Sequence, residues 1–148
     1  MNALLGSKYE TSLRILLLLE AAQGETLPEG AITALDYITV YAHDFGLSDV
    51  NLHGENKYRF GEYAFRRTTT KNAIKQLVLD GLVDVIASEC GFHYKLSSDG
   101  YNFVGDFCSE YADAYYETAT RIIDRIGTSE LVLSGMINHL TISSIQEA

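Results

Sequence analysis

The chain has few cysteines, few basic residues and no long apolar run, and each shortage excludes a class of protein. Its 148 residues include two cysteines, Cys90 and Cys108, which are too few for a disulfide framework. The longest uninterrupted apolar run, Ile15 to Leu19, is far too short to span a bilayer. The N-terminus has neither the basic start nor the small-residue cleavage site of a signal peptide. We therefore expect a cytoplasmic protein with reduced thiols and no membrane contact.

Positive charge is scarce and is concentrated in one segment. The chain carries 11 Lys and Arg against 20 Asp and Glu, for a net charge of −9. Residues 57–75 hold six basic residues and one acid, Glu62, a net of +5, whereas the remainder holds five basic residues and nineteen acids, a net of −14. Acidic surface repels DNA within about a Debye length, roughly 8 Å at physiological salt. The chain could therefore meet DNA with one face only, and this charge pattern favours a binding module over an enzyme.

No motif of the sequence points to catalysis or to a cofactor. The four histidines, His43, His53, His93 and His139, have no spacing to one another or to a cysteine that is typical of a metal site. The sequence has no HExxH motif, no GxxxxGK or GxGxxG phosphate loop and no GxSxG turn. We therefore predict a protein that is not an enzyme and binds neither cofactor nor metal.

Apolar spacing predicts helices over the first third of the chain. A first helix is expected after a capping box at residues 7–10 and should end near Gly24. A second helix is expected over residues 28–45, although the β-prone run at 38–41 makes a strand the rival interpretation there. Residues 46–57 are polar and rich in Gly, Asn, Asp and Ser, which predicts a loop.

The stretch from Tyr58 to Gly105 predicts a winged helix-turn-helix. The expected order is a short helix, a turn, a longer helix and two strands, at residues 60–65, 66–67, 68–80, 82–86 and 92–96. The longest helix should follow, over about 98–126, with its apolar residues on one stripe and its acids opposite. Gly127 should end it before a last helix begins. The predicted fold class is mainly α: one winged-helix domain over residues 1–148, with helices and a two-stranded hairpin wing in 8–96 and a C-terminal helical extension in 98–146.

The start of the second helix of this motif is the candidate contact surface. Helix-turn-helix proteins present that start to DNA, and Thr hydroxyls and Arg guanidinium groups are usual phosphate ligands. The alternative is a solvated helix N-terminus whose threonines only cap it. The candidates for contact with a protein partner or nucleic acid are Arg59, Arg66, Arg67, Thr68, Thr69, Thr70, Lys71 and Lys75, with His93 and Lys95 from the hairpin. Because the hairpin has little positive charge, we expect DNA binding to be weak and salt-sensitive at most.

Three of these cations carry a further expectation about stability. Arg66, Arg67 and Lys71 would lie near the positive end of the helix dipole, which disfavours cations. We therefore expect them to be exposed and to serve a partner. Changing Arg66 and Arg67 to Glu would then leave the melting temperature nearly unchanged.

The long helix carries more aromatic residues than one stripe can bury. Tyr and Phe are favoured at protein interfaces. The candidate interface residues are Tyr101, Phe103, Phe107, Tyr111, Tyr115 and Tyr116. The acidic side of the same helix suits either a solvated face or a docking face for a basic partner. The sequence leaves open whether the chain forms a homodimer through this helix.

Four short motifs occur in an order and spacing that resemble a known family. They are Leu35-Asp36-Tyr37, Leu52-His53, Gly61-Glu62 with Arg66-Arg67, and Gly81-Leu82-Val83. Over residues 13–126 the chain resembles the Middle Component 2 proteins of bacterial ABC-three component systems, with Gly54 standing where that pattern usually has Pro.

The resemblance implies a function as well as a fold. It implies a non-catalytic winged-helix adaptor that bridges or regulates an SMC/Rad50-like ABC ATPase and a third, effector-bearing component in bacterial defence. The competing interpretation is a free-standing winged-helix DNA-binding transcription regulator that dimerises through its long helix.

Overall fold

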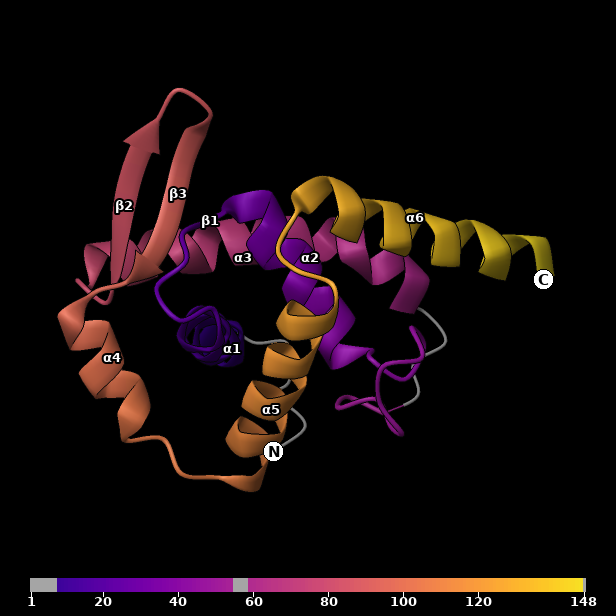
Figure 1. Ribbon diagram of the computed structural model, residues 1–148, viewed down its shortest axis with the longest axis horizontal. Coiled ribbons are helices and arrows are strands. Elements are labelled where there is room, and N and C mark those ends of the chain that lie inside the picture. The colour runs from indigo at the N-terminus through magenta and orange to yellow at the C-terminus, as the bar shows by residue number, and fades with distance from the viewer. Residues whose placement is uncertain (1–7, 55–58, 148) are drawn as a thin grey trace.

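The computed structural model describes residues 8–54 and 59–147. In these residues the chain forms six helices and three short strands (Figure 1). In chain order they are α1 (Lys8–Ala21), β1 (Leu27–Pro28), α2 (Glu29–Val40), α3 (Arg59–Leu79), β2 (Val83–Ser88), β3 (Gly91–Leu96), α4 (Ser98–Gly105), α5 (Glu110–Arg125) and α6 (Glu130–Glu147). The predicted mainly α class is confirmed, and the order of elements up to β3 is compatible with a winged helix-like fold.

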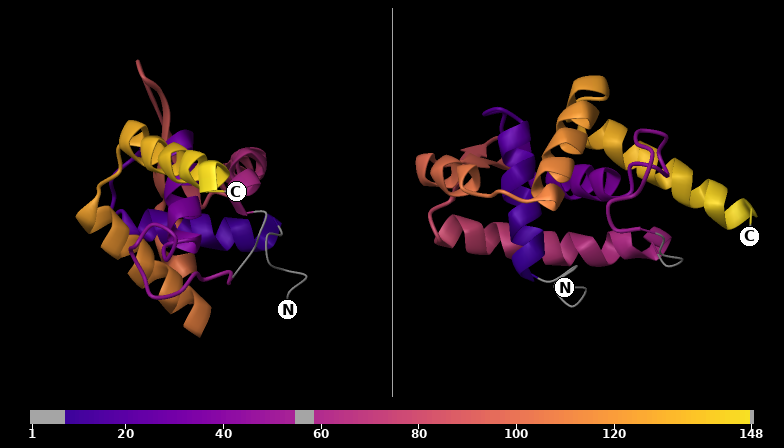
Figure 2. Two further views of the ribbon diagram at one scale, coloured as in Figure 1. Left: turned by 90° about the vertical axis from the view of Figure 1, so that its right-hand side faces the viewer. Right: turned by 90° about the horizontal axis from the view of Figure 1, so that it is seen from below.

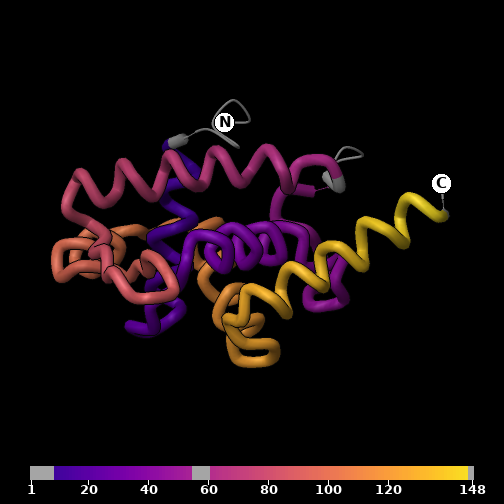
Figure 3. The backbone as a smooth tube through the Cα atoms, turned by 90° about the horizontal axis from the view of Figure 1, so that it is seen from above, coloured from indigo at the N-terminus to yellow at the C-terminus, as the bar shows by residue number. Residues whose placement is uncertain are grey.

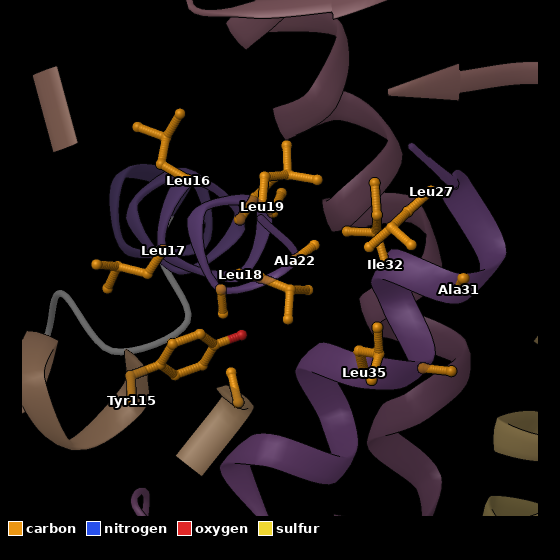
Figure 4. Close-up of a cluster of buried hydrophobic side chains, with 14 of the residues drawn as sticks. Leu16, Leu17, Leu18, Leu19, Ala22, Leu27, Ala31, Ile32, Leu35 and Tyr115 are labelled. Carbon is orange, nitrogen blue, oxygen red and sulfur yellow. The ribbon is translucent and has the colours of Figure 1, made fainter. Parts of the chain in front are cut away.

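Helix α2 is the centre of the hydrophobic core. Every residue from Ala31 to Ala42 is buried, including the β-prone run at 38–41 for which a strand was the rival interpretation. The predicted helix is confirmed, but it ends at Val40 instead of residue 45, and hydrogen-bonded turns follow. In Figure 4, Leu18 of α1 and Ala22, which directly follows that helix, face α2, and the Tyr115 ring enters the core from α5.

Helix α3 replaces the helix and turn predicted over residues 60–80. It is continuous from Arg59 to Leu79 and runs along one side of α1 and α2 (Figures 2 and 3). The predicted turn at residues 66–67 is therefore wrong. The threonines that were expected to cap a new helix lie inside α3, where the Thr69 hydroxyl donates to the Phe65 carbonyl at 3.4 Å. The two helices that precede the hairpin are α2 and α3.

Strands β2 and β3 form the predicted hairpin, and β1 adds a third strand. The order in the sheet is β1-β3-β2, and both pairings are antiparallel. Val83 pairs with Leu96 at the base of the hairpin, and Ser88 pairs with Gly91 at its tip. The additional strand β1 was not predicted, because it has two residues and is too short to show an alternating pattern.

The predicted long helix over residues 98–126 is two helices. Helix α4 ends at Gly105, and a linker leads to Ser109, whose hydroxyl caps α5 by accepting a hydrogen bond from the Ala112 N–H at 3.0 Å. Apolar and aromatic residues keep helical spacing across the linker, which is why periodicity missed the break. The helix predicted after Gly127 is confirmed as α6.

Helix α4 is held tightly against the base of the hairpin. The Ser97 N–H donates to the Leu82 carbonyl at 3.0 Å, and the Ser97 hydroxyl donates to the Gly81 carbonyl at 2.7 Å. A Cβ atom on Gly100 would lie 2.1 Å from the Leu82 carbonyl oxygen, so a larger residue would separate α4 from the hairpin. This contact fixes where the hairpin leaves the body.

Candidate functional site

Asp36 is the centre of a group of charged and polar side chains buried between α1, α2, α3 and α5. Its carboxylate accepts hydrogen bonds from Arg14 Nε at 2.9 Å, from Arg66 Nη1 at 2.9 Å and from the Tyr115 hydroxyl at 2.7 Å. The Asp36, Arg14 and Tyr115 side chains are all buried. We refer to the whole group as the Asp36 cluster: Glu10, Arg14, Asp36, His53, Glu62, Arg66, Tyr111 and Tyr115.

A second layer of this cluster surrounds Glu10 and His53. The Glu10 carboxylate accepts from Arg14 Nη1 at 3.0 Å and from the Tyr111 hydroxyl at 3.0 Å. His53 Nε2 lies 2.8 Å from the Tyr111 oxygen, and His53 Nδ1 lies 3.5 Å from Arg66 Nη2. Because the Tyr111 hydroxyl donates to Glu10, its oxygen accepts from His53 Nε2. This arrangement favours the neutral His53 tautomer with the proton on Nε2.

The charges of the cluster fix which groups stay ionised. Burial would raise the pKa of Asp36, but the guanidinium groups of Arg14 and Arg66 outweigh it and hold that pKa below its usual value. Burial, reinforced by the same two cations, lowers the pKa of His53. Burial and the neighbouring Asp36 carboxylate raise the pKa of Tyr115 well above its usual value. At neutral pH, Asp36 is therefore charged, and His53 and Tyr115 are neutral.

Arg66 lies inside the molecule, so the expectation that it is exposed is wrong. It is 5% exposed and pairs with Asp36 and, at 3.3 Å, with Glu62. The reason is the continuity of α3, which places residue 66 on the same buried side as Thr70, Ala73 and Leu77. The expectation that its replacement leaves the melting temperature unchanged depended on exposure and therefore no longer holds.

The other predicted contact residues fall into two groups. Arg67, Thr68, Lys71 and Lys75 are exposed on α3, and their role as contacts stays a prediction. Thr70 is buried, Thr69 is half-buried, and the Arg59 side chain lies outside the described part of the structure. His93 and Lys95 are half-buried on β3, opposite Ile86 and Asp84 of β2.

The predicted interface aromatics also divide between surface and interior. Tyr101 and Phe103 are exposed on α4, and the Phe107 ring packs edge-on against Phe103 with their centroids 5.2 Å apart. Tyr115 is fully buried, and Tyr111 is half-buried with its hydroxyl bonded to Glu10. Tyr116 is half-buried against the core. The exposed aromatic surface is therefore on α4, and the tyrosines of α5 mainly hold the interior together.

An open groove lies between α3 and the hairpin, and we call it the hairpin groove. Its volume is about 360 Å³, and it is lined by Glu29, Lys71, Ile74, Lys75, Val78, Leu79, Val85, Phe92 and Tyr94. The hairpin register explains the apolar lining. Val85 pairs with Tyr94 and Ala87 with Phe92, on the same face of the hairpin as the buried pair Val83 and Leu96. The body covers only the base of this apolar face.

Helix α6 carries a second apolar surface. Leu133 and Ile137 are buried, and α6 packs on α2. The C-terminal end of the helix continues beyond the body (Figures 1 and 3). There Ile142 and Ile145 are 55% and 68% exposed, and residues 131–146 include no Asp, Glu, Lys or Arg. We call residues 140–146 the α6 tip.

A family model for the ABC-three component (ABC-3C) system Middle Component 2 matches residues 4–147. The chain belongs to this family. The resemblance inferred from four short motifs is thus confirmed over nearly the whole chain. The Middle Component 2 family name makes this protein one component of a multi-component system, which suggests protein partners. Neither a comparison with curated proteins nor one with solved structures gives a significant match.

Three of the four motifs that carried the resemblance meet in the Asp36 cluster of this Middle Component 2 protein. They contribute Asp36, His53, and Glu62 with Arg66. The fourth motif contains Gly81, which ends α3 with a φ of +79°, and Leu82, which contacts Gly100. These motifs therefore hold the helices and the hairpin in place.

Sequence reasoning missed the Asp36 cluster, although two residues signalled it. Asp36 lies within a strongly apolar helix, and Arg14 directly precedes the apolar run Ile15 to Leu19. A charge on a buried helix needs a partner of opposite charge, so the two together predict an ion pair. The described residues include no group of three or more His, Cys, Asp or Glu placed to hold a metal ion, and no helix with the length and hydropathy to cross a membrane.

Proposed function

We propose that this protein is a non-catalytic adaptor or regulatory subunit that links the ABC ATPase of its system to a third, effector component in bacterial defence. Membership of the Middle Component 2 family supports the place in the system. The observation that carries the linking role is a pair of exposed apolar surfaces, the hairpin groove and the α6 tip, at opposite ends of the molecule (Figure 1).

Each surface suits a protein interface. Contiguous exposed apolar residues at the surface of a folded protein mark interaction sites more often than scattered single ones do. The groove combines apolar residues of α3 with those of the hairpin, and the α6 tip presents two isoleucines on a stretch, residues 131–146, that has no Asp, Glu, Lys or Arg. Because the two surfaces are far apart, two partners can bind at the same time.

The buried Asp36 cluster also supports the linking role. It joins α1, α2, α3 and α5 through hydrogen bonds that each depend on the exact positions of the helices. Buried ionic groups add little stability compared with apolar packing, but they can specify one arrangement of the elements. A linker that transmits a defined orientation between two partners benefits from such a fixed body.

The alternative function is that of a free-standing winged-helix DNA-binding regulator. The structure offers it little positively charged surface. With Arg66 in the interior, the exposed cations in residues 61–79 of α3 are Arg67, Lys71 and Lys75. Three phosphate contacts give weak and strongly salt-dependent binding. The α3 and hairpin face that would meet DNA is mainly apolar. We therefore expect any DNA affinity to be micromolar or poorer.

Co-purification with the two other components of the system tests the proposal. The tagged protein is expressed with the ATPase, with the third component, and with both. We expect the wild-type protein to retain both at once, and Ile142→Asp with Ile145→Asp to lose one of them while keeping the other. Val50→Asp, an exposed apolar residue of the loop after α2, is the matched control. A wild-type protein that retains neither component, but binds one DNA sequence with nanomolar affinity, would be a regulator instead.

A further inference from the structure

We propose that the hairpin groove binds a short protein segment in which apolar side chains are flanked by Asp or Glu. This inference rests on the proposed function, because it states what one of the two end surfaces recognises. It goes beyond that function by assigning the groove and the chemistry of its ligand. The segment belongs to one of the two other components of the system.

The floor of the groove is apolar and continuous with the hydrophobic core. Every hairpin residue on the face towards α3 is apolar or aromatic, from the buried pair Val83 and Leu96 outward to Ala87 and Phe92. On the helix side, Ile74 is buried, and Leu79 at the rim is 71% exposed. Phe92 on the facing rim is 62% exposed. A ligand that covers both rims removes this apolar surface from water.

Two lysines give the groove its charge preference. Lys71 and Lys75 are four residues apart on α3, so they lie on the same side of the helix, and both line the groove. Among the described residues that line the groove, Glu29 at the start of α2 is the one acid. The chain as a whole has a net charge of −9. An acidic segment is therefore repelled by most of the molecule and attracted here.

The shape of the groove argues for a peptide segment over a small molecule. Its volume of about 360 Å³ is near the lower end of ligand pockets, which hold roughly 300–1,000 Å³ and bury most of their ligand. Such pockets also place several polar groups around the ligand, whereas here the charged groups lie along α3 and at Glu29. A groove with exposed rims suits a few side chains of a longer partner.

The apolar lining also argues against nucleic acid as the ligand. DNA binding draws mainly on neutralised phosphates, and a duplex would leave Leu79 and Phe92 without an apolar contact. Duplex DNA is nevertheless the natural competitor, because winged-helix proteins use this helix and hairpin for it.

Peptide binding tests the inference. Short overlapping peptides that tile both other components are screened against the full-length protein, and the tightest are measured by fluorescence anisotropy. We expect these to combine apolar residues with Asp or Glu. Phe92→Ser with Leu79→Gln should weaken them by at least about tenfold, as loss of central interface anchors does. Lys71→Glu with Lys75→Glu should weaken them similarly and reverse their salt dependence, because the groove then repels acidic residues and salt screens that repulsion. Arg67→Glu, an exposed cation that does not line the groove, is the control.

Three results would overturn the inference. The first is that the tightest peptides are neutral or basic. The second is that both groove variants bind them as the wild-type protein does, with melting temperatures that show all variants are folded. The third is that duplex DNA displaces them. If the groove variants still co-purify fully with both components, the groove assignment fails and the adaptor role stands. If the wild-type protein retains neither component, the adaptor role itself fails.

Discussion

The two halves of α3 use charged and apolar residues in opposite ways. In the N-terminal half, Glu62 and Arg66 point inward to the Asp36 cluster, while Phe65 between them is 72% exposed. In the C-terminal half, Lys71 and Lys75 are exposed, and apolar residues up to Leu79 face the hairpin groove. The same helix therefore fixes the body with charges and offers a surface with apolar groups. Net charge by segment does not reveal which residues form the surface.

Arg66 and its neighbour Arg67 give the sharpest test of this contrast. Arg66→Glu removes one cation from Asp36 and adds an acid next to it. Breaking a buried ion pair costs about 3–5 kcal/mol, so we expect the free energy of unfolding to fall by more than this amount. Arg67→Glu, at an exposed position, should change stability by at most about 0.5 kcal/mol. Urea denaturation measures both. Equal stabilities for the two variants would show that the buried pair does not hold the fold.

Tyr115→Phe removes only one hydrogen bond of the cluster. The Tyr115 hydroxyl donates to the charged Asp36 carboxylate, and hydrogen bonds to charged groups contribute about 1.5–3 kcal/mol. We expect a loss in that range, because the ring itself stays packed. Tyr116→Phe, at a half-buried ring of the same helix, is the matched control and should be nearly neutral. A neutral Tyr115→Phe would mean that the two arginines alone satisfy Asp36.

The free energy of unfolding should decrease in two stages as the pH is lowered. His53 has a lowered pKa in the folded state, so below its ordinary value of about 6.5 the unfolded chain binds more protons and acidification favours unfolding. Asp36, also lowered, contributes stability that is complete above its ordinary value of about 3.8 and is lost as the pH falls further.

Urea denaturation over a pH series measures this, with His53→Gln as the comparison. Gln can still form hydrogen bonds but does not titrate, so the variant should lack the first stage and keep the second. If His53→Gln shows a first stage of unchanged size, that loss of stability comes from another titrating residue.

Substitutions at the groove rim should have the smallest effect on stability. Leu79→Gln changes an exposed residue, so its free energy of unfolding should stay within about 0.5 kcal/mol of the wild-type value. Leu77→Gln, two residues earlier and buried, should lower the free energy of unfolding several times more, because it buries an amide that has no hydrogen-bond partner. Thermal melts of the pair check this. A large effect of Leu79→Gln would place that side chain in the core.

The sequence predicted the parts of the fold that depend on local patterns. Most helices follow from apolar spacing, and the hairpin follows from two short strands with Gly91 at the turn. The turn at Arg66 and Arg67 was wrong, because arginines and threonines fit a helix interior as well as a turn, and only packing decides between them. The break before α5 was missed because apolar spacing continues across it.

The Asp36 cluster is harder to predict for a different reason. Asp36 stands out within the apolar α2, and Arg14 stands out beside the apolar run Ile15 to Leu19, so their need for partners can be read from the sequence. Which partners they find depends on how α1, α3 and α5 pack around α2, and local periodicity carries no information about that. The hairpin groove likewise appears only when the register of the hairpin and the end of α3 are both known.

The sequence distances within the Asp36 cluster have a consequence for folding kinetics. Asp36 bonds to residues 22, 30 and 79 positions away. Contacts that close such long loops are costly to form early in folding, so we expect these bonds to form after the rate-limiting step. Weakening them should then accelerate unfolding and leave the folding rate nearly unchanged. Stopped-flow kinetics of Tyr115→Phe would show this as a shift of the unfolding limb alone, and a slower folding limb would contradict it. The buried charges would thus determine how long a folded molecule lasts, and the apolar core how quickly it forms.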